Sequence, residues 1–172
     1  MASQRRTSAA SAMAPTASTT AAELNYVFYD GNVPADLVKM CNKRIKELFL
    51  ATKDQLVTSK SIVLACWHEY TLGSLRSGPK RIIELAGFVE VDSAGYIGWL
   101  ITMPEFQGRG IASNLIESLK LKFTSLSLHE DSTNEGLTNF YKKRGFRLIP
   151  ELQRHVKNGP TTFLLQYYMV WP

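Results

Sequence analysis

The apolar residues of the chain recur in two patterns, one with helical spacing and one with the short runs typical of strands. Helical spacing predicts amphipathic helices over about 34–51, 110–122 and 134–144. The first two apolar stripes consist of Leu37, Cys41, Ile45 and Leu48, and of Ile111, Leu115, Ile116 and Leu119. Each of these helices therefore has one face to bury against another layer of the fold.

Short apolar runs bounded by Gly, Pro or Asp predict strands between these helices. They lie at 24–31, 61–69, 82–91, 96–103, 123–128, 146–149 and 161–170. The run 96–103 is apolar almost throughout, which is typical of a central strand. The order of elements predicts one mixed sheet with helices on its faces, an α/β (α+β) architecture.

Residues 1–22 show neither pattern and consist almost entirely of Ala, Ser and Thr. Such a segment buries too little apolar surface to order itself, so we expect a disordered tail before one folded domain over 23–172. Two arginines, many hydroxyls and no acidic residue before Glu23 are also typical of an organelle transit peptide. The plain tail predicts a cytoplasmic protein. A cleaved transit peptide predicts a plastid or mitochondrial one, and the sequence leaves cleavage open.

The composition of the chain indicates which kinds of molecule it can bind. The 172 residues include 20 Lys and Arg against 15 Asp and Glu, a net charge of +5 that suits an anionic ligand such as a nucleotide cofactor. No basic run with interleaved aromatics indicates nucleic acid, and no stretch approaches the roughly 18 apolar residues that would indicate a membrane span. Cys41 and Cys66 lack metal-ligand spacing, so we expect free buried thiols and no metal.

The stretch PEFQGRGIA at 104–112 joins an apolar strand to a helix through two glycines. Free backbone N–H groups at a helix N-terminus bind anions, and phosphate fits them best. Gly108 and Gly110 permit positive φ and close approach of a ligand, and Arg109 adds a charged donor. The loop is neither a Walker motif nor a dinucleotide fingerprint, because no Gly-Lys-Ser/Thr follows and Ser113 replaces the third glycine. An ordinary chain turn remains the alternative from this loop alone.

Two blocks of the chain resemble the GNAT superfamily of acyl-CoA-dependent N-acyltransferases. The segment QGRGIA at 107–112 is similar to its (Gln/Arg)-x-x-Gly-x-(Gly/Ala) motif, and LITMP at 100–104 is similar to the strand that leads into it. NEGLTNFYKKRGF at 134–146 is similar to the second block, with Gly136 in place of the usual alanine. The resemblance covers about 150 residues. It implies the GNAT fold, a single mixed, mostly antiparallel sheet of about six to seven strands, with acetyl-CoA as co-substrate and no metal.

The resemblance also implies which residues hold the cofactor. The loop would bind the pyrophosphate through Gln107, Gly108, Arg109, Gly110, Ile111 and Ala112. In the family the central strand splays from its neighbour, so the backbone of Leu100, Ile101 and Thr102 would meet the pantetheine arm and the thioester carbonyl. Asn134 would cap its helix and contact the cofactor.

Tyr141 is the residue that the resemblance assigns to acid catalysis, as the donor of a proton to the departing thiolate. From spacing alone, a tyrosine packed between Phe140 and Phe146 is the simpler interpretation. Many members of the family carry a catalytic carboxylate on the strand that enters the loop, whereas residues 94–103 contain none and Tyr96 stands near that place.

The general base is therefore open, and four side chains are candidates. Period two places Glu84, Glu90 and Asp92 on one strand face, and His129 ends the next strand with an ordinary pKa near neutrality. A chain of water molecules, or an amine that arrives already neutral, is an equal alternative.

The expected function is transfer of an acetyl group from acetyl-CoA to a primary amine by direct attack in a ternary complex. A small-molecule amine is the leading substrate, and a protein lysine or N-terminal amine is the alternative. A non-catalytic acyl-CoA-binding regulatory module is a further alternative because the strand carboxylate is missing, although retention of Tyr141 argues against it. The identity of the acceptor and the oligomeric state, monomer or homodimer, stay open.

Overall fold

The computed structural model describes residues 22–49, 56–72, 78–157 and 163–172. The chain begins with β1 (Glu23–Asp30) and α1 (Ala35–Leu48), followed by β2 (Ile62–Leu72), β3 (Lys80–Val91) and β4 (Ile97–Thr102). Next come the 3₁₀ turn η2 (Pro104–Phe106), α2 (Ile111–Lys120), β5 (Leu126–Asp131) and α3 (Glu135–Lys142). The last elements are β6 (Arg147–Leu148), the 3₁₀ turn η3 (Pro150–Leu152), β7 (Arg154–Lys157) and β8 (Phe163–Trp171).

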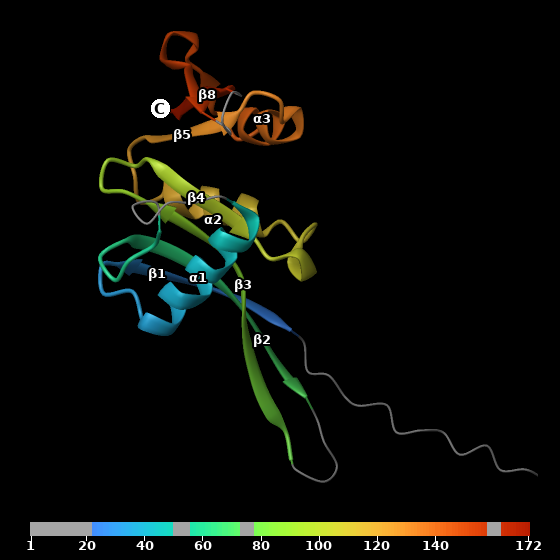
Figure 1. Ribbon diagram of the computed structural model, residues 1–172. Helices are drawn as coiled ribbons and strands as arrows, with labels where there is room; N and C mark the ends of the chain where they lie inside the picture. Colours follow the sequence, from blue (N-terminus) through green and yellow to red (C-terminus); the bar gives the residue numbers. More distant parts are fainter. Residues whose placement is uncertain (1–21, 50–55, 73–77, 158–162) are drawn as a thin grey trace, which may run out of the picture.

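These strands form two antiparallel sheets (Figure 1). The first has the order β1-β2-β3-β4, and in the second β8 lies between β5 and β6 and also pairs with β7. The sheets meet where β4 and β5 run parallel, at an isolated bridge between Tyr96 and Ser127. The predicted α/β fold with mostly antiparallel strands is confirmed, but the single sheet that we expected is divided between β4 and β5.

The helices bury their predicted apolar faces in two core clusters. Leu37 and Ile45 of α1 pack with Phe88 on one side of the first sheet. Apolar residues of α2 and α3, including Leu115, pack with those of β5 and β8 in the other cluster. Each cluster contains one of the two cysteines, and both are free and buried, as expected.

One predicted strand begins later than expected, and another has a different place in the sheet. The strand expected at 123–128 begins at Leu126, because Phe123 still closes the last turn of α2 by donating its N–H to Leu119 O at 2.9 Å. The strand at 96–103, expected to be central, is the edge of the first sheet and faces β5. β7 was not predicted, since its sequence RHVK is polar. The tail predicted over 1–22 lies, apart from Ala22, outside the described residues.

Both predicted ends of α3 are confirmed. Asn134 Oδ1 accepts a hydrogen bond from the N–H of Leu137 at 3.0 Å, which caps the helix. Gly145 has φ +81°, and Phe146, which is buried, donates its N–H back to Tyr141 O at 3.2 Å. No helix in the described part of the chain is long and apolar enough to cross a membrane.

Truncation of the core beneath the loop at 107–110 should cost stability. Leu115 is fully buried, so we expect Leu115→Ala to lower the free energy of unfolding by about 2–5 kcal/mol through lost contacts and a residual cavity. Leu121 is 89% exposed, and Leu121→Ala is the matched control with an expected change below about 0.5 kcal/mol. Urea unfolding followed by circular dichroism measures both, and equal losses would contradict this description of the core.

Candidate active site

The parting of β4 from β5 leaves backbone groups of β4 without a strand partner. Met103 donates its N–H to Ala86 O at 2.9 Å, and Ile101 is the register partner of Phe88. Because antiparallel strands alternate the direction of their peptide groups, those of Leu100 and Thr102 point away from β3, towards β5. Ile101 was expected to offer free backbone groups as well, and this was wrong because its peptide groups face β3.

The place where β4 and β5 are no longer paired is called the opening below. Thr102 adds an unsatisfied side chain to it. Its Oγ1 is buried and has no hydrogen-bond partner in the described structure. Buried hydroxyl groups are nearly always bonded, so an orphan of this kind beside unpaired backbone marks a place for a ligand with amide or carbonyl groups.

The predicted anion loop has the required backbone geometry. Gly108 and Gly110 both have φ +76°, which confirms the predicted need for glycine at these positions. Asn114 is the first residue of α2 whose N–H is bonded along the helix, to Gly110 O at 3.0 Å. The N–H groups of Ile111, Ala112 and Ser113 precede it and have no backbone acceptor in the described residues, so they can receive an anion.

Some side chains of the loop are exposed where a ligand would bind, and others are buried in the core. The guanidinium of Arg109 lies 5.1 Å from the centre of the Phe106 ring, which keeps a positive charge at the loop. Gln107 is exposed, whereas the side chain of Ile111 is buried in the core. Ile111 therefore contributes its backbone to the anion site while its side chain holds α2 in place.

Tyr141 lies on α3 and is buried against two aromatic rings, as the simpler interpretation of its spacing predicted. Its ring centre is 5.1 Å from that of Phe140 and 5.3 Å from that of Phe146. Burial raises the pKa of its phenol, and the negative charge of nearby Glu130 on β5 raises it further. Tyr141 thus keeps its proton at neutral pH, as a proton donor must.

A second cluster joins the two sheets beside the bridge. The Tyr96 hydroxyl and His129 Nδ1 lie 3.1 Å apart, and the His129 ring is 4.8 Å from that of Tyr168. Burial lowers the pKa of His129, and the positive charge of Arg154 lowers it further. His129 is therefore neutral at neutral pH and can accept a proton.

The three carboxylates predicted to share a strand face do not do so. The register between β2 and β3 shifts at Cys66/Trp67, and this irregularity places Glu84 and Glu90 on opposite faces. Glu84 lies on the projecting β2–β3 hairpin and accepts a hydrogen bond from Tyr70 at 3.4 Å. Asp92 belongs to a turn, where its Oδ1 accepts the N–H of Tyr96 at 2.8 Å.

Glu90 is the one carboxylate of the three that lies beside β4. Its half-buried side chain covers Gly98, which is the extra residue of a bulge in β4, and a Cβ at Gly98 would collide with Glu90 Oε2. Burial raises the pKa of Glu90, and the charge of Asp92 acts in the same direction. Glu90 is therefore a rival to His129 as a proton acceptor.

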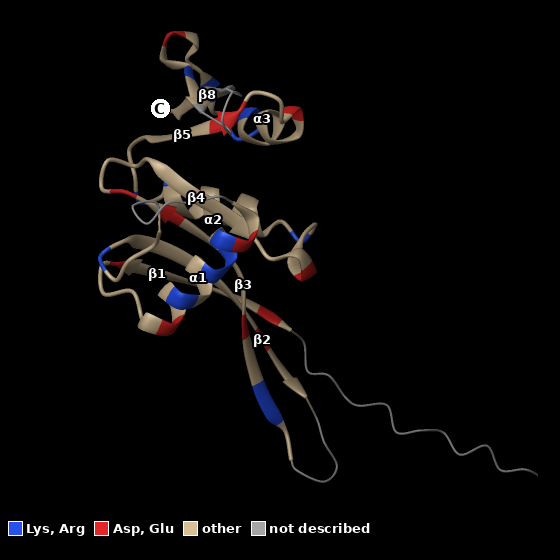
Figure 2. Ribbon diagram, viewed as in Figure 1, with Lys and Arg blue, Asp and Glu red and all other residues tan. Residues whose placement is uncertain are grey.

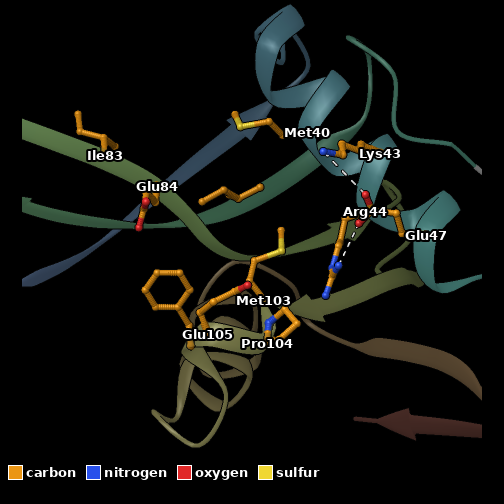
Figure 3. A pocket seen from close by; sticks show the side chains of 11 residues that line it. Met40, Lys43, Arg44, Glu47, Ile83, Glu84, Met103, Pro104 and Glu105 are labelled. Carbon is orange, nitrogen blue, oxygen red and sulfur yellow. Dashed lines mark hydrogen bonds and ion pairs between the residues drawn. The ribbon is translucent and has the colours of Figure 1, made fainter.

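A hollow of about 530 Å³ borders η2, the turn that leads from β4 into the anion loop (Figure 3). Side chains of α1, β3 and η2 line it, and Arg44 reaches across from α1 towards Pro104 while its Nη1 binds Glu47 at 2.9 Å. Of the residues predicted to act in chemistry, only Glu84 lines this hollow.

Sequence reasoning missed two polar residues beside the opening. Glu130, on β5, is a charged residue at an apolar position of a strand, a signal that strand alternation contained. Arg144 stacks on Phe140 with 3.6 Å between guanidinium and ring centre, and it donates to Ser113 Oγ on α2. Lys120 of α2 donates in return to Arg144 O at 2.6 Å, so α2 and α3 are fixed to each other.

Comparison with known proteins agrees with this geometry. Residues 80–163 match the model of the acetyltransferase (GNAT) domain family. A search of curated proteins finds no match for the chain. Among solved structures, a GNAT acetyltransferase from Streptococcus pneumoniae has a TM-score of 0.61 at 18% identity, over 86% of this chain and 98% of that one.

Two further structures have the same fold. Arabidopsis thaliana NAA60 in complex with a bisubstrate analogue has a TM-score of 0.58 at 17% identity, over 86% of this chain and 97% of that one. The ribosomal-protein-S18-alanine N-acetyltransferase from Escherichia coli has a TM-score of 0.55 at 14% identity, over 86% and 94%. This chain therefore has the GNAT fold, and its residues 80–163 match the GNAT acetyltransferase domain family, in agreement with its motifs.

The anion loop can be tested with a pair of glycine substitutions. Gly110 and Gly31 have φ +76° and +68°, and a Cβ at either position has nothing within 4 Å. We expect Gly110→Val to abolish CoA binding, because the side chain would occupy the anion position. Gly31→Val carries a similar backbone strain of about 1–2 kcal/mol away from the loop and should leave binding intact. Titration calorimetry with CoA measures both, and binding by the Gly110 variant would contradict the assignment.

Proposed function

We propose that the protein is an N-acetyltransferase that transfers the acetyl group of acetyl-CoA directly to an amine in a ternary complex. The observation that carries this proposal is the placement of a proton donor and a proton acceptor on opposite faces of the opening between β4 and β5. Leu128 and Glu130 face the core beneath α3, where Tyr141 lies, and strand alternation turns His129 to the other face. A thioester in the opening would lie between them.

Acetyl-CoA fits the groups around this opening. The loop at 107–112 would hold the pyrophosphate, and the pantetheine amides would meet the free backbone of Leu100 and Thr102. Asn134 uses its side chain as a helix cap, and a contact to the cofactor stays a prediction. A fold relative, Arabidopsis thaliana NAA60, is known in complex with acetyl-CoA, at 13% identity and a TM-score of 0.54. Backbone N–H groups directed at a developing oxyanion are typically worth about 3 kcal/mol in the transition state.

A proton relay through Tyr96 accounts for removal of the amine proton. As the amine attacks the thioester carbonyl, its proton passes to the Tyr96 oxygen while the Tyr96 proton passes to His129 Nδ1, 3.1 Å away. The carbon–sulfur bond then breaks, and Tyr141 protonates the thiolate. This relay replaces the strand carboxylate that the sequence lacks, which argues against the non-catalytic regulatory module.

The strength of this base favours an α-amino group as the acceptor. The pKa of His129 lies below its ordinary value of about 6.5, while an α-ammonium has a pKa of about 8 and a lysine ammonium about 10.4. The pKa difference that opposes proton transfer to His129 is therefore larger by more than about two units for a lysine or alkylamine than for an α-amino group. We infer the N-terminal amine of a peptide or protein as the acceptor, ahead of the small alkylamine that the sequence alone favoured. The fold relative from Escherichia coli, an alanine N-acetyltransferase, is consistent with this acceptor.

Release of free thiol from acetyl-CoA tests the proposed function. We would compare peptides with free N-termini, the same peptides blocked at the N-terminus but carrying lysine, and small alkylamines. Turnover confined to peptides with free N-termini supports an α-amino acceptor. Turnover with alkylamines alone would show that the acceptor is a small molecule. Binding of acetyl-CoA without turnover on any amine would support the regulatory module.

The base predicts a specific pH dependence. Since only neutral His129 accepts a proton, kcat/KM should rise with pH through its lowered pKa, in a limb below about pH 6.5. We expect His129→Gln to lose about 10²-fold in kcat/KM and to lack this limb. If Glu90→Gln removes the limb and His129→Gln does not, the base is Glu90 instead.

The acid predicts an effect on turnover alone. Tyr141→Phe keeps the ring packed against Phe140 and Phe146 and removes only the hydroxyl. We expect kcat to fall by about 10²-fold or more while the affinity for acetyl-CoA and the melting temperature stay near wild type. The loss would be smaller if attack of the amine, rather than departure of the thiolate, limits the rate. Wild-type turnover across the pH range would remove Tyr141 from the mechanism.

A further inference from the structure

The hollow of about 530 Å³ beside η2 has no part in the chemistry proposed above. Its volume lies within the range of about 300–1,000 Å³ that is typical of ligand sites. It is enclosed by α1, by η2 and by the part of β3 that extends past the end of β4. Met103 and Pro104, which line it, directly follow β4, so the hollow begins where the free backbone of β4 ends.

The hollow and the proposed base lie on the same face of the sheets. α1, which lines the hollow, covers the face of the first sheet on which Ile101 packs. α2 and α3 cover the other face together with Leu128, and strand alternation turns His129 away from that face. The faces of the two sheets are continuous where β4 and β5 meet at the bridge. An amine that reaches His129 therefore approaches from the face on which the hollow lies.

The hollow is a few residues of extended chain away from the proposed reaction. The bridge to β5 lies at the start of β4, so Leu100 is the free backbone group nearer to His129, and the thioester carbonyl would lie beside it. Met103 follows Leu100 by three residues. This separation is about 10 Å at roughly 3.3 Å per residue. A peptide that follows β4 from the thioester would place its third or fourth side chain in the hollow.

The walls of the hollow are largely apolar. Figure 3 shows Met40 on the α1 wall and Met103 on the wall formed by the end of β4. Met40 is 37% exposed and Ile83 is 51% exposed, so apolar surface remains here for a ligand to cover. Methionine is flexible and polarisable and adapts to apolar side chains of different shape. The apolar lining consists of Met40, Ile83, Leu85, Met103, Pro104 and Phe106.

The charges around the hollow disfavour an acidic ligand. Figure 2 shows basic residues along α1, and Glu47 on the same helix binds Arg44 at 2.9 Å and Lys43 at 3.8 Å. On the other walls, Glu84 and Glu105 form no ion pair with any described residue. Two cations against three carboxylates leave a charge of −1 at the hollow. A further carboxylate would be repelled, whereas an apolar side chain would not.

Arg44 adds an unsatisfied donor to the hollow. Its side chain extends from α1 towards Pro104 (Figure 3). Its Nη1 is bonded to Glu47, but its Nε is buried and has no hydrogen-bond partner in the described structure. Buried N–H groups nearly always have an acceptor, and a peptide that lies in the hollow brings backbone carbonyl groups to this place.

We propose that the hollow is a subsite for the acceptor peptide and binds a large apolar side chain, such as leucine or methionine, at its third or fourth residue. This rests on the proposed function. The apolar side chain packs between Met40 and Met103, and a backbone carbonyl group of the peptide accepts the free N–H of Arg44. The subsite gives the enzyme a preference for sequence behind the N-terminal amine, which a small alkylamine could not use.

Hexapeptides with a free N-terminus and a single leucine in an alanine background test the position of this subsite. Burial of a leucine side chain favours binding by about 10-fold or more. KM should therefore be about 10-fold below that of the all-alanine peptide with leucine at the third or fourth residue, and near it with leucine at the second or sixth. Aspartate at the best position should raise KM above that of alanine. Equal KM for leucine at every position, or a lower KM with aspartate or lysine than with leucine, would overturn the proposal.

Two variants test the walls of the hollow. Met40→Gln keeps the length of the side chain and makes the wall polar, so the preference for leucine over alanine should fall by about 10-fold. Leu48→Gln, at an exposed position of the same helix outside the hollow, is the matched control and should retain the preference. Glu105→Lys should reduce the rejection of aspartate, and Glu23→Lys, also exposed, should not. Equal effects of variant and control in either pair would contradict the assignment.

Binding in the hollow can be observed without turnover. In protein labelled with ¹³C at the methionine methyl groups, addition of CoA and the N-acetylated leucine peptide should shift the resonances assigned by Met40→Leu and Met103→Leu. Met169, which is fully buried in the core, should not shift. Unchanged Met40 and Met103 resonances would overturn the subsite even if the enzyme is active. Absence of thiol release with every amine would instead overturn the proposed function, and the resonances remain measurable in that case.

Discussion

The site depends on the single point at which the two sheets touch. Ser127 donates its N–H to Gly95 O at 3.0 Å, and beyond the bridge between Tyr96 and Ser127 the two parallel strands are not paired in the described structure. The peptide groups of β4 that would bond a neighbouring strand are left for another partner. A buried backbone group needs such a partner, so the fold requires either water or an amide-bearing ligand at this place. The pantetheine arm of acetyl-CoA is a ligand of this kind.

Strand alternation then assigns the chemistry to two faces. Along β5, Leu128 and Glu130 face the core beneath α3 while His129, between them, faces the other way. A thioester held between the strands would have the proposed acid, Tyr141, on one side and the proposed base on the other. The amine can therefore lose its proton and the thiolate can gain one in the same reaction without competing for one side chain.

Local sequence signals predicted the parts of the site that local geometry builds. Gly108 and Gly110 were predicted from their need for positive φ, and Asn134 from its place before a helix, because each depends only on neighbouring residues. The contact between Tyr96 and His129 joins positions 33 residues apart and has no local pattern. The bulges in β3 and β4 likewise depend on pairing with other strands. They are the reason that strand alternation did not place Glu84, Glu90 and Asp92 on one face.

The anion loop and the proposed acid must also keep a fixed distance, since one cofactor would contact both. Two hydrogen bonds in opposite directions provide this link: Lys120 at the end of α2 donates to Arg144 O at 2.6 Å, and Arg144 donates to Ser113 Oγ at the start of α2. Arg144 also packs on the ring of Phe140, the residue before Tyr141. A shift of α3 would therefore break contacts at both ends of α2, so the helix that begins at the anion loop and the helix that holds the acid move as one unit.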